Sequence, residues 1–294
     1  MNLRAWMRLT RVPNLVTVPG DPLAGLLIAT GGVWPGGFPA AAVLLAPVCL
    51  YAAGLVMNDL CDQEEDRVER PARPLPSGDV PPGAARAAVV LLMLAGLGLC
   101  AAAGNRALIT GVILAGAITF YNLSAKRVSV LGPFVMGLCR GLSLLLGATP
   151  FLQRGVTDPL LLLGAFEAVL LYIAMVTHLA RSETRDRSPY YAAWAPFAVL
   201  FITVGLAACR ARPWGGALVV LGLAAILAAL FAARSALGMQ ERRRVVPWHI
   251  GVLISALLPL QAMWVAASGR WDLALIVLAL LPLNQGLKRL ASAS

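Results

Sequence analysis

Long apolar runs alternate with short polar segments along the whole chain of 294 residues. A bilayer core about 30 Å thick needs about 20 apolar residues in a helix, so runs of this length predict membrane-spanning helices. The pattern predicts an all-α transmembrane bundle of nine or ten spans, forming one domain over residues 1–294. The windows are 13–32, 39–58, 84–104, 107–124, 131–151, 159–180, 190–209, 214–235, 248–267 and 271–287.

The composition agrees with this class of protein. Hydrophobic residues make up 59% of the chain and charged residues only 13%, and the five cysteines are scattered without metal-ligand spacing. The net charge of +10 comes from cations in short loops, which fits membrane topology and anionic headgroups better than nucleic acid. We expect membrane lipids and no nucleic acid as partners. The first window contains prolines but no convincing cleavage site, so we expect a retained first helix.

The distribution of basic residues predicts the orientation of the chain. With the N-terminus inside, the inner segments hold 18 of the 24 Lys and Arg residues. The positive-inside rule therefore predicts a cytoplasmic N-terminus. It also favours ten spans, because a tenth span returns Lys288 and Arg289 to the cytoplasm. We expect an integral protein of a bacterial inner membrane.

One polar cluster follows the second window directly, in the sequence NDLCDQEEDRVERPARPLPSG. On a helix, Asn58, Asp62 and Asp66 would recur at i, i+4 and i+8 and share one face. Oxygen ligands arranged in this way at a membrane boundary suit a Mg²⁺ ion that bridges a diphosphate. The alternative is a solvated loop whose acids pair with its own arginines.

Two further polar segments lie on the predicted cytoplasmic side. The sequence HLARSETRDRS ends the sixth window and places Glu183 and Asp186 at i, i+3, which is a weaker indication of a metal site. Positive charge that anchors a helix end would explain this segment equally well. At the end of the fourth window, Tyr121 precedes Lys126 and Arg127. The two cations could neutralise a diphosphate, or all three could be ordinary interfacial residues.

Asp21, Arg140 and Glu167 lie inside predicted spans. Such groups cost about 2.5–3.5 kcal/mol on insertion scales, so they are expected to face the interior of the bundle. We expect Arg140 and Glu167 to pair, more as structural support than in catalysis. Asn14 and Asp21 enter from the first span and are expected to line a common cavity.

Together these segments resemble the UbiA superfamily of intramembrane prenyltransferases, from about residue 8 to residue 235. The opening RLTRVPNLVTVPGDPLAG is similar to the first helix of that family, where Asn14 would line the active cavity. The SETRD segment is similar to a divergent bacterial branch found with Ebo-type gene clusters. Glu183 and Asp186 depart from the DxxxD or DxxD second motif of the family. The first motif, NDxxDxxxD with an RPLxSG ending, is matched by Asn58, Asp59, Asp62, Asp66, Arg70, Arg73, Pro74, Leu75, Ser77 and Gly78.

The resemblance implies Mg²⁺-dependent transfer of a prenyl group from an allylic prenyl diphosphate donor to an unidentified aromatic or lipid acceptor, at a site facing the cytoplasm. The implied metal ligands are Asn58, Asp62 and Asp66, with Glu183 and Asp186 for a second ion. The implied catalytic residues are Asp59, Asp62, Asp66, Arg73 and Lys126. The implied substrate-binding residues are Asn14, Asp21, Arg70, Tyr121, Asn122, Arg127, Arg140 and Arg181.

Because a fold does not prove a chemistry, a second hypothesis stays open. In it, the chain is a non-catalytic UbiA-like membrane protein that binds or transports a lipid or metabolite. Phosphatidyl-alcohol transfer is less favoured, because its DGxxAR-type motif is not found in the sequence.

Overall fold

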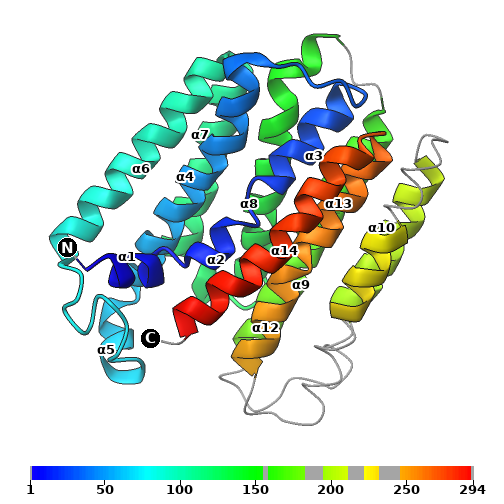
Figure 1. Cartoon of the computed structure of the whole chain (residues 1–294). Helices are drawn as coiled ribbons and strands as arrows, with labels where there is room; N and C mark the ends of the chain where they lie inside the picture. The colour runs from blue at the N-terminus through cyan, green and yellow to red at the C-terminus, as the bar shows by residue number, and fades with distance from the viewer. Residues whose placement is uncertain (1, 155–157, 183–194, 211–221, 232–245, 293–294) are drawn as a thin grey trace.

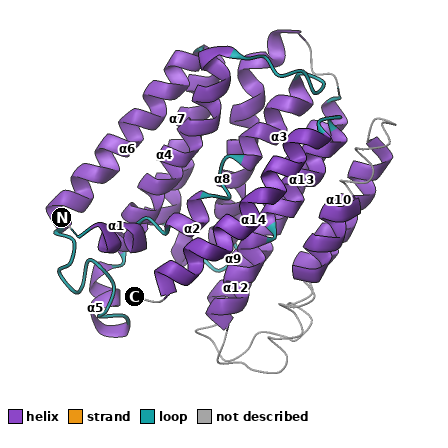
Figure 2. Cartoon of the chain, in the orientation of Figure 1, coloured by secondary structure: helices purple, strands orange, loops and turns teal. Residues whose placement is uncertain are grey.

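The computed structural model describes residues 2–154, 158–182, 195–210, 222–231 and 246–292. Within these ranges the regular structure is helical and no strand occurs (Figure 1 and Figure 2), which confirms the all-α expectation. The helices are α1 Leu3–Leu9, α2 Val12–Leu15, α3 Gly20–Ala29, α4 Gly37–Cys61, α5 Gln63–Glu69, α6 Pro82–Ala103, α7 Asn105–Leu123, α8 Leu131–Ala148, α9 Pro159–Ser182, α10 Ala195–Arg210, α12 Val246–Ser255, α13 Leu257–Ala267 and α14 Trp271–Ser292, with 3₁₀ turns η1 Ala125–Arg127 and η2 Thr149–Arg154.

Eight segments of the described chain are long and apolar enough to cross a bilayer. Each coincides closely with one of the ten windows expected from hydropathy, and α14 continues through Pro282. The windows 190–209 and 214–235 contain shorter described helices, α10 and Gly222–Phe231. The chain is therefore an integral membrane protein built as a helical bundle.

The first span is interrupted rather than continuous, because it is rich in proline. Between α2 and α3 the chain makes short turns, and Pro19 has no amide hydrogen to continue the helical ladder. The amide of Asp21 therefore donates to the carbonyl of Val18 (3.3 Å) and not to that of Thr17. The Thr17 carbonyl oxygen is left available to side chains from other helices. The first span is therefore present as expected, but it consists of two helices, α2 and α3, and not of a single helix.

Helix α13 is apolar apart from Gln261 and is buried along its whole length, as expected for a helix in the centre of a bundle. It packs against α3, α10 and α14. Trp264 is the largest fully buried side chain of this region. Because the apolar residues of α13 contact several spans, this helix forms much of the common core.

Helices α3 and α8 approach each other closely through glycines. A Cβ atom on Gly25 would lie 1.9 Å from the Leu144 carbonyl oxygen, and one on Gly147 would lie 1.9 Å from the Pro22 carbonyl oxygen. In lipid, helices associate through packing and polar contacts, so small residues at the contact strengthen it. The glycines thus set the separation of the two helices.

We expect Gly147→Ala to destabilise the protein by about 1–3 kcal/mol, since the added methyl group would meet backbone that no rotamer change can move. Gly116→Ala on α7 is the matched control, because the space around Gly116 in the described structure is open. The measurement is the midpoint temperature at which each variant stops eluting as a single species in detergent. Equal midpoints for both variants would show that α3 and α8 do not pack this closely.

Candidate active site

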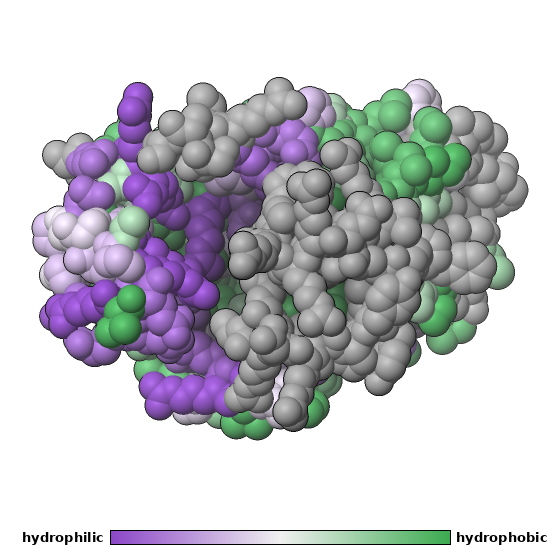
Figure 3. All heavy atoms as spheres, turned by 90° about the horizontal axis from the view of Figure 1, so that it is seen from below, coloured by the Kyte–Doolittle hydropathy of each residue, from purple (hydrophilic) through white to green (hydrophobic). Residues whose placement is uncertain are grey.

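A cavity of about 160 Å³ lies between α4, α7 and α8. Its wall is apolar over most of its surface, and polar side chains occur at both ends. Figure 3 views the bundle from the end that carries α1 and α5, where hydrophilic side chains gather beside a hollow. The lining residues are Arg11, Val18, Pro47, Tyr51, Gly54, Leu55, Asn58, Leu114, Ile118, Tyr121, Asn122, Met136, Cys139, Arg140 and Ser143.

The helix that carries the acidic cluster breaks at Asp62. Helix α4 ends at Cys61, α5 begins at Gln63, and Asp62 has φ −99° and ψ 7° between them. The amide of Asp62 still donates to the Asn58 carbonyl (3.0 Å). The continuous helical face expected for Asn58, Asp62 and Asp66 is therefore wrong.

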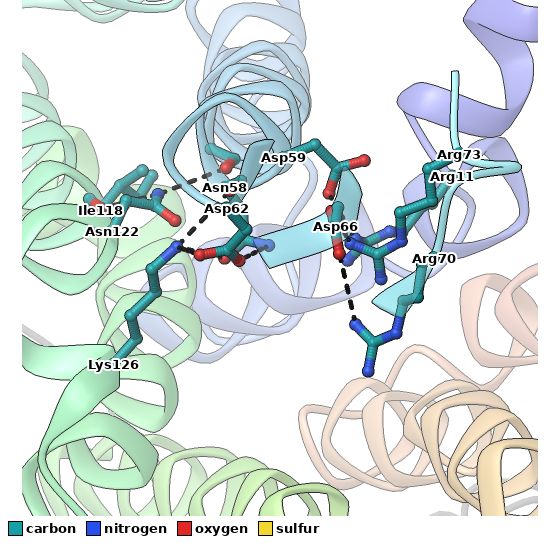
Figure 4. Close-up of polar contacts among 11 residues, drawn as sticks. Arg11, Asn58, Asp59, Asp62, Asp66, Arg70, Arg73, Ile118, Asn122 and Lys126 are labelled. Atoms are coloured by element: carbon teal, nitrogen blue, oxygen red, sulfur yellow. Dashed lines mark hydrogen bonds and ion pairs between the residues drawn. The ribbon is translucent and has the colours of Figure 1, made fainter. Parts of the chain in front are cut away.

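Asn58 and Asp62 form one half of the divided cluster, together with a lysine from a distant segment. The Nδ2 of Asn58 donates to Asp62 Oδ2 (3.2 Å), and Lys126 Nζ lies 2.5 Å from Asp62 Oδ1 and 3.4 Å from Asn58 Oδ1 (Figure 4). The turn η1 carries Lys126 to this position directly after α7. Since Asn58 also lines the cavity, this ion pair lies beside its charged end.

Asp59 and Asp66 form the other half, and both are almost fully buried. Asp59 pairs with Arg11 (2.7 Å) and Asp66 with Arg73 (2.6 Å), while Arg70 is 3.8 Å from Asp66 (Figure 4). Arg73 also lies 3.6 Å from Asp59 and so joins the two carboxylates.

Arg73 is delivered by the loop that follows α5. The Ser77 amide donates to the Arg73 carbonyl (2.9 Å), the Val80 amide donates to the Pro74 carbonyl (3.0 Å), and Gly78 has φ +82°. Glycine adopts this left-handed conformation at little cost, which explains its place in the RPLPSG sequence. The compact loop turns the Arg73 guanidinium back toward the end of α4.

The cluster as a whole carries a net positive charge, which favours binding of an anion. Four cations, Arg11, Arg70, Arg73 and Lys126, surround three carboxylates, those of Asp59, Asp62 and Asp66. The acids pair with arginines, as the solvated-loop interpretation expected. However, two of the partners, Arg11 and Lys126, come from outside the acidic segment, and Asp59 and Asp66 are buried. An interhelical cluster of this kind is more than a solvated loop.

Among the described residues, no three acidic, histidine or cysteine side chains converge as a metal site. The oxygens of Asn58 and Asp62 are nevertheless adjacent and are hard donors. Mg²⁺ commonly takes one or two carboxylates and completes its shell with water and substrate phosphate oxygens, so this donor set fits the ion. Glu183 and Asp186, expected to hold a second ion, lie outside the described residues.

The other predicted substrate-binding residues take different positions. Tyr121 and Asn122 line the cavity, and Asn122 Nδ2 donates to the Gly54 carbonyl (3.2 Å) on α4. Arg127 is exposed, and Arg181 donates to the Val128 carbonyl (2.6 Å). Neither Arg127 nor Arg181 is among the residues that line the cavity described here.

The first span contributes to the cavity through residues that the sequence interpretation did not select. Arg11 and Val18 line it, whereas Asn14 and Asp21 do not, so the expected position of the latter two is wrong. Arg11 has φ +46°, a strained value for a residue with a side chain. The sequence interpretation included Arg11 only among the basic residues expected on the cytoplasmic side.

Arg140 pairs with Asp21 and not with Glu167, which corrects the expected intramembrane ion pair. Its Nη2 lies 2.7 Å from Asp21 Oδ2, and both side chains are almost fully buried, whereas Glu167 is exposed on α9. Arg140 and Glu167 lie at similar depth on consecutive helices, which suggested that they pair. The residue that faces Arg140 instead comes from the interrupted first span. Gln261 of α13 also donates to Asp21 Oδ1 (2.7 Å).

Comparison with known proteins agrees with this geometry. A sequence profile described as the UbiA prenyltransferase family matches residues 22–248. Digeranylgeranylglyceryl phosphate synthase of Methanoculleus marisnigri is 33% identical over 147 residues, 50% of this chain and 52% of the relative. The chain thus spans about half the length of this curated relative.

Two solved structures have a similar fold. The apo structure of a UbiA homolog from Aeropyrum pernix K1 has a TM-score of 0.65 at 20% identity, covering 85% of this chain and 96% of the homolog. A UbiA homolog from Archaeoglobus fulgidus bound to GPP and Mg²⁺ has a TM-score of 0.63 at 15% identity, covering 91% and 99%. At these identities the comparison establishes the fold.

We expect Arg140→Leu to cost about 3–5 kcal/mol, because it leaves the buried Asp21 carboxylate without its cation. Glu167→Leu should leave stability nearly unchanged, since the side chain is exposed and the pair does not involve it. Thermal midpoints of the purified variants measure both effects. A double variant of Arg140→Leu with Asp21→Leu should recover most of the loss. Failure to recover would contradict the pairing.

Proposed function

The chain belongs to the UbiA prenyltransferase family, and on this premise we propose that it transfers a prenyl group from an allylic prenyl diphosphate to an acceptor inside the membrane. The observation that carries the proposal is the charged cluster of Asp62, Lys126, Arg11 and Arg73 at the end of a cavity with mostly apolar walls. An amphipathic substrate with a polyanionic head and an isoprenoid tail matches this distribution of charge.

The diphosphate head would bind where Asn58 and Lys126 meet. Arg11 lines the same end of the cavity, and Arg73 stands behind it in contact with Asp59 and Asp66. Hydrogen bonds from these cations would strengthen as negative charge develops on the leaving diphosphate, and interactions that grow in this way lower a barrier.

The tail would extend from the charged end along the apolar wall formed by Leu55, Leu114, Ile118 and Met136. An allylic cation that forms during departure of the diphosphate reacts readily with water. Enclosure between packed helices favours capture by the acceptor instead.

Asn58 and Asp62 would hold Mg²⁺, together with oxygens of the diphosphate. The ion, when bound, offsets the charge of the leaving group as a Lewis acid. Asp66 was also predicted to be a ligand, and in that role it would exchange its contact with Arg73 for the ion. Glu183 and Asp186 remain the predicted ligands of a second ion.

The acceptor is proposed only as an aromatic or lipid molecule. The relative described above is named for a glyceryl phosphate product, and both it and the matched structures come from archaea. The charge distribution of the loops supports a site that faces the cytoplasm. The membrane is proposed to be a bacterial inner membrane. Membrane lipids surround the protein whether the acceptor is aromatic or a lipid.

We expect Asp62→Asn to lower the Mg²⁺-dependent release of diphosphate from geranyl diphosphate at least about 100-fold, because a charged partner of the ion and of Lys126 is removed. The assay uses purified protein, Mg²⁺ and an extract of host lipids as the source of acceptor. Glu64→Gln is the matched control, since the Glu64 side chain is exposed and its ion pair among the described residues is with Arg67 at the surface (2.8 Å). It should retain normal activity.

Prenylated product identified by mass would establish transfer. A wild-type protein that binds geranyl diphosphate with Mg²⁺ but never releases diphosphate would contradict the proposal. That result would favour the non-catalytic carrier. Full activity of Asp62→Asn would instead remove Asp62 from the reaction.

Lys126→Met tests two different effects of the lysine, one on cation binding and one on diphosphate binding. Lys126 competes with a cation for Asp62 and Asn58, so its removal should raise the affinity for Mn²⁺, used as a paramagnetic stand-in for Mg²⁺, about tenfold in the absence of donor. Turnover should fall by at least tenfold, because the diphosphate loses a hydrogen-bond donor. Electron paramagnetic resonance measures the first effect. Unchanged Mn²⁺ binding would show that the Asp62 oxygens do not hold the ion.

A further inference from the structure

One acidic side chain of the membrane-spanning part takes no part in the candidate active site. Glu167 of α9 is exposed and does not line the cavity. Within the described parts of the chain, its carboxyl group has neither an ion pair nor a hydrogen bond. The protomer therefore leaves this group without a partner.

Glu167 lies near the middle of its span. The span runs from Pro159 to Arg181, so at 1.5 Å per residue Glu167 is about 12 Å from one end and about 21 Å from the other. Long basic side chains near a helix end can extend to the water, but a glutamate at this depth cannot. Its carboxyl group stays in the apolar phase, where a polar group without a hydrogen-bond partner is costly.

The surface around Glu167 is an apolar stripe along one side of α9. Leu160, Leu163 and Leu171 are 59%, 51% and 45% exposed and lie at i−7, i−4 and i+4, on the same face of the helix as Glu167. The other sides of α9 pack against α3, α8, α10 and α12. Over residues 160–171, this face thus presents one hydrogen-bonding side chain within an apolar surface.

A second copy of the chain supplies a matching group at the same depth. Two copies inserted in the same orientation are related by a two-fold axis along the membrane normal, so Glu167 of one copy can meet Glu167 of the partner subunit. A protonated carboxyl group carries a donor and an acceptor. Two such groups can therefore satisfy each other without placing a charge in the lipid.

The described surface of a second copy offers no cation to this glutamate. Among the described residues, Arg140 is the basic side chain in the middle of a span, and it is buried and paired with Asp21 (2.7 Å). The group that can complement Glu167 in a second copy is therefore the same carboxyl group. Hydrogen bonds between polar side chains hold helices together in lipid, where burial of apolar surface does not.

We propose that the α9 face formed by Leu160, Leu163, Glu167 and Leu171 is the contact surface between two copies of this chain. The two Glu167 carboxyl groups exchange hydrogen bonds at the centre of the contact, and the leucines pack around them. The dimer goes beyond the proposed prenyl transfer and does not depend on it.

Energy transfer between fluorophores attached at the N-terminus tests the dimer in phosphatidylcholine vesicles that contain only the purified protein. Wild type should give transfer above the level of random proximity, and the transfer should fall on dilution with lipid. Glu167→Leu should need about tenfold higher protein density for the same transfer, because the hydrogen bonds between the helices are lost. Glu167→Gln should stay within about threefold of wild type, because an amide also pairs with its own kind.

Glu65→Leu is the matched control. Glu65 is exposed on α5, outside the candidate spans, so the same chemical change should leave the transfer unchanged. Glu167→Leu should still fold, since the Glu167 side chain supports nothing within the protomer.

Oxidative cross-linking in the same vesicles tests which face is in contact. In a Cys209→Ser background, which removes an exposed native thiol, Leu171→Cys should form a disulfide-linked dimer. Ile113→Cys, on an exposed position of α7, should not.

Random-level transfer by wild type at every density would overturn the proposal, as would equal cross-linking at positions 113 and 171. Loss of association in Glu167→Gln as large as in Glu167→Leu would overturn the carboxyl pair, and would indicate that the glutamate needs a cation from a different membrane protein. None of these measurements involves a prenyl diphosphate. A dimer that never releases diphosphate would refute the proposed function alone, and an active monomer would refute the dimer alone.

Discussion

The ion pair between Lys126 and Asp62 connects the end of α4 to the turn after α7, 64 positions later in the chain. A carboxylate at the end of an apolar bundle is stable there only when a cation from another segment compensates it. Arg11 performs the same task for Asp59 from the first span. The contacts bring α4, the turn after α7 and the first span together at one end of the cavity, and the geometry of the site depends on them.

The cavity combines two electrostatic environments on one axis. At one end, cations outnumber carboxylates, which suits a polyanionic leaving group. At the other end, Asp21 balances Arg140, and only neutral hydrogen-bonding capacity remains. Under the proposed function, the diphosphate of the donor would lie at the charged end.

The sequence was sufficient to predict the spans, because hydropathy over about 20 residues follows directly from bilayer thickness. It was also sufficient to locate the acidic motif and Lys126 at one end of the bundle. It was not sufficient to predict the helix break at Asp62, since the spacing of Asn58, Asp62 and Asp66 fits an unbroken helix.

The partner of Arg140 was missed for a related reason. Equal depth on neighbouring helices does not specify which faces meet, and the packing of α3 on α8 through Gly25 and Gly147 decided the pairing. Gln261 carried a sequence signal, an amide within an apolar span, that pointed to this network.

The interrupted first span also has a consequence for biogenesis. The Thr17 carbonyl receives its hydrogen bonds from α8 and from Gln261, which is synthesised 244 residues later. Arg140 can satisfy this backbone group in the apolar phase once α8 is inserted, whereas the contact from Gln261 forms only after α13 has been inserted, so the full set of hydrogen bonds around the first span is completed late.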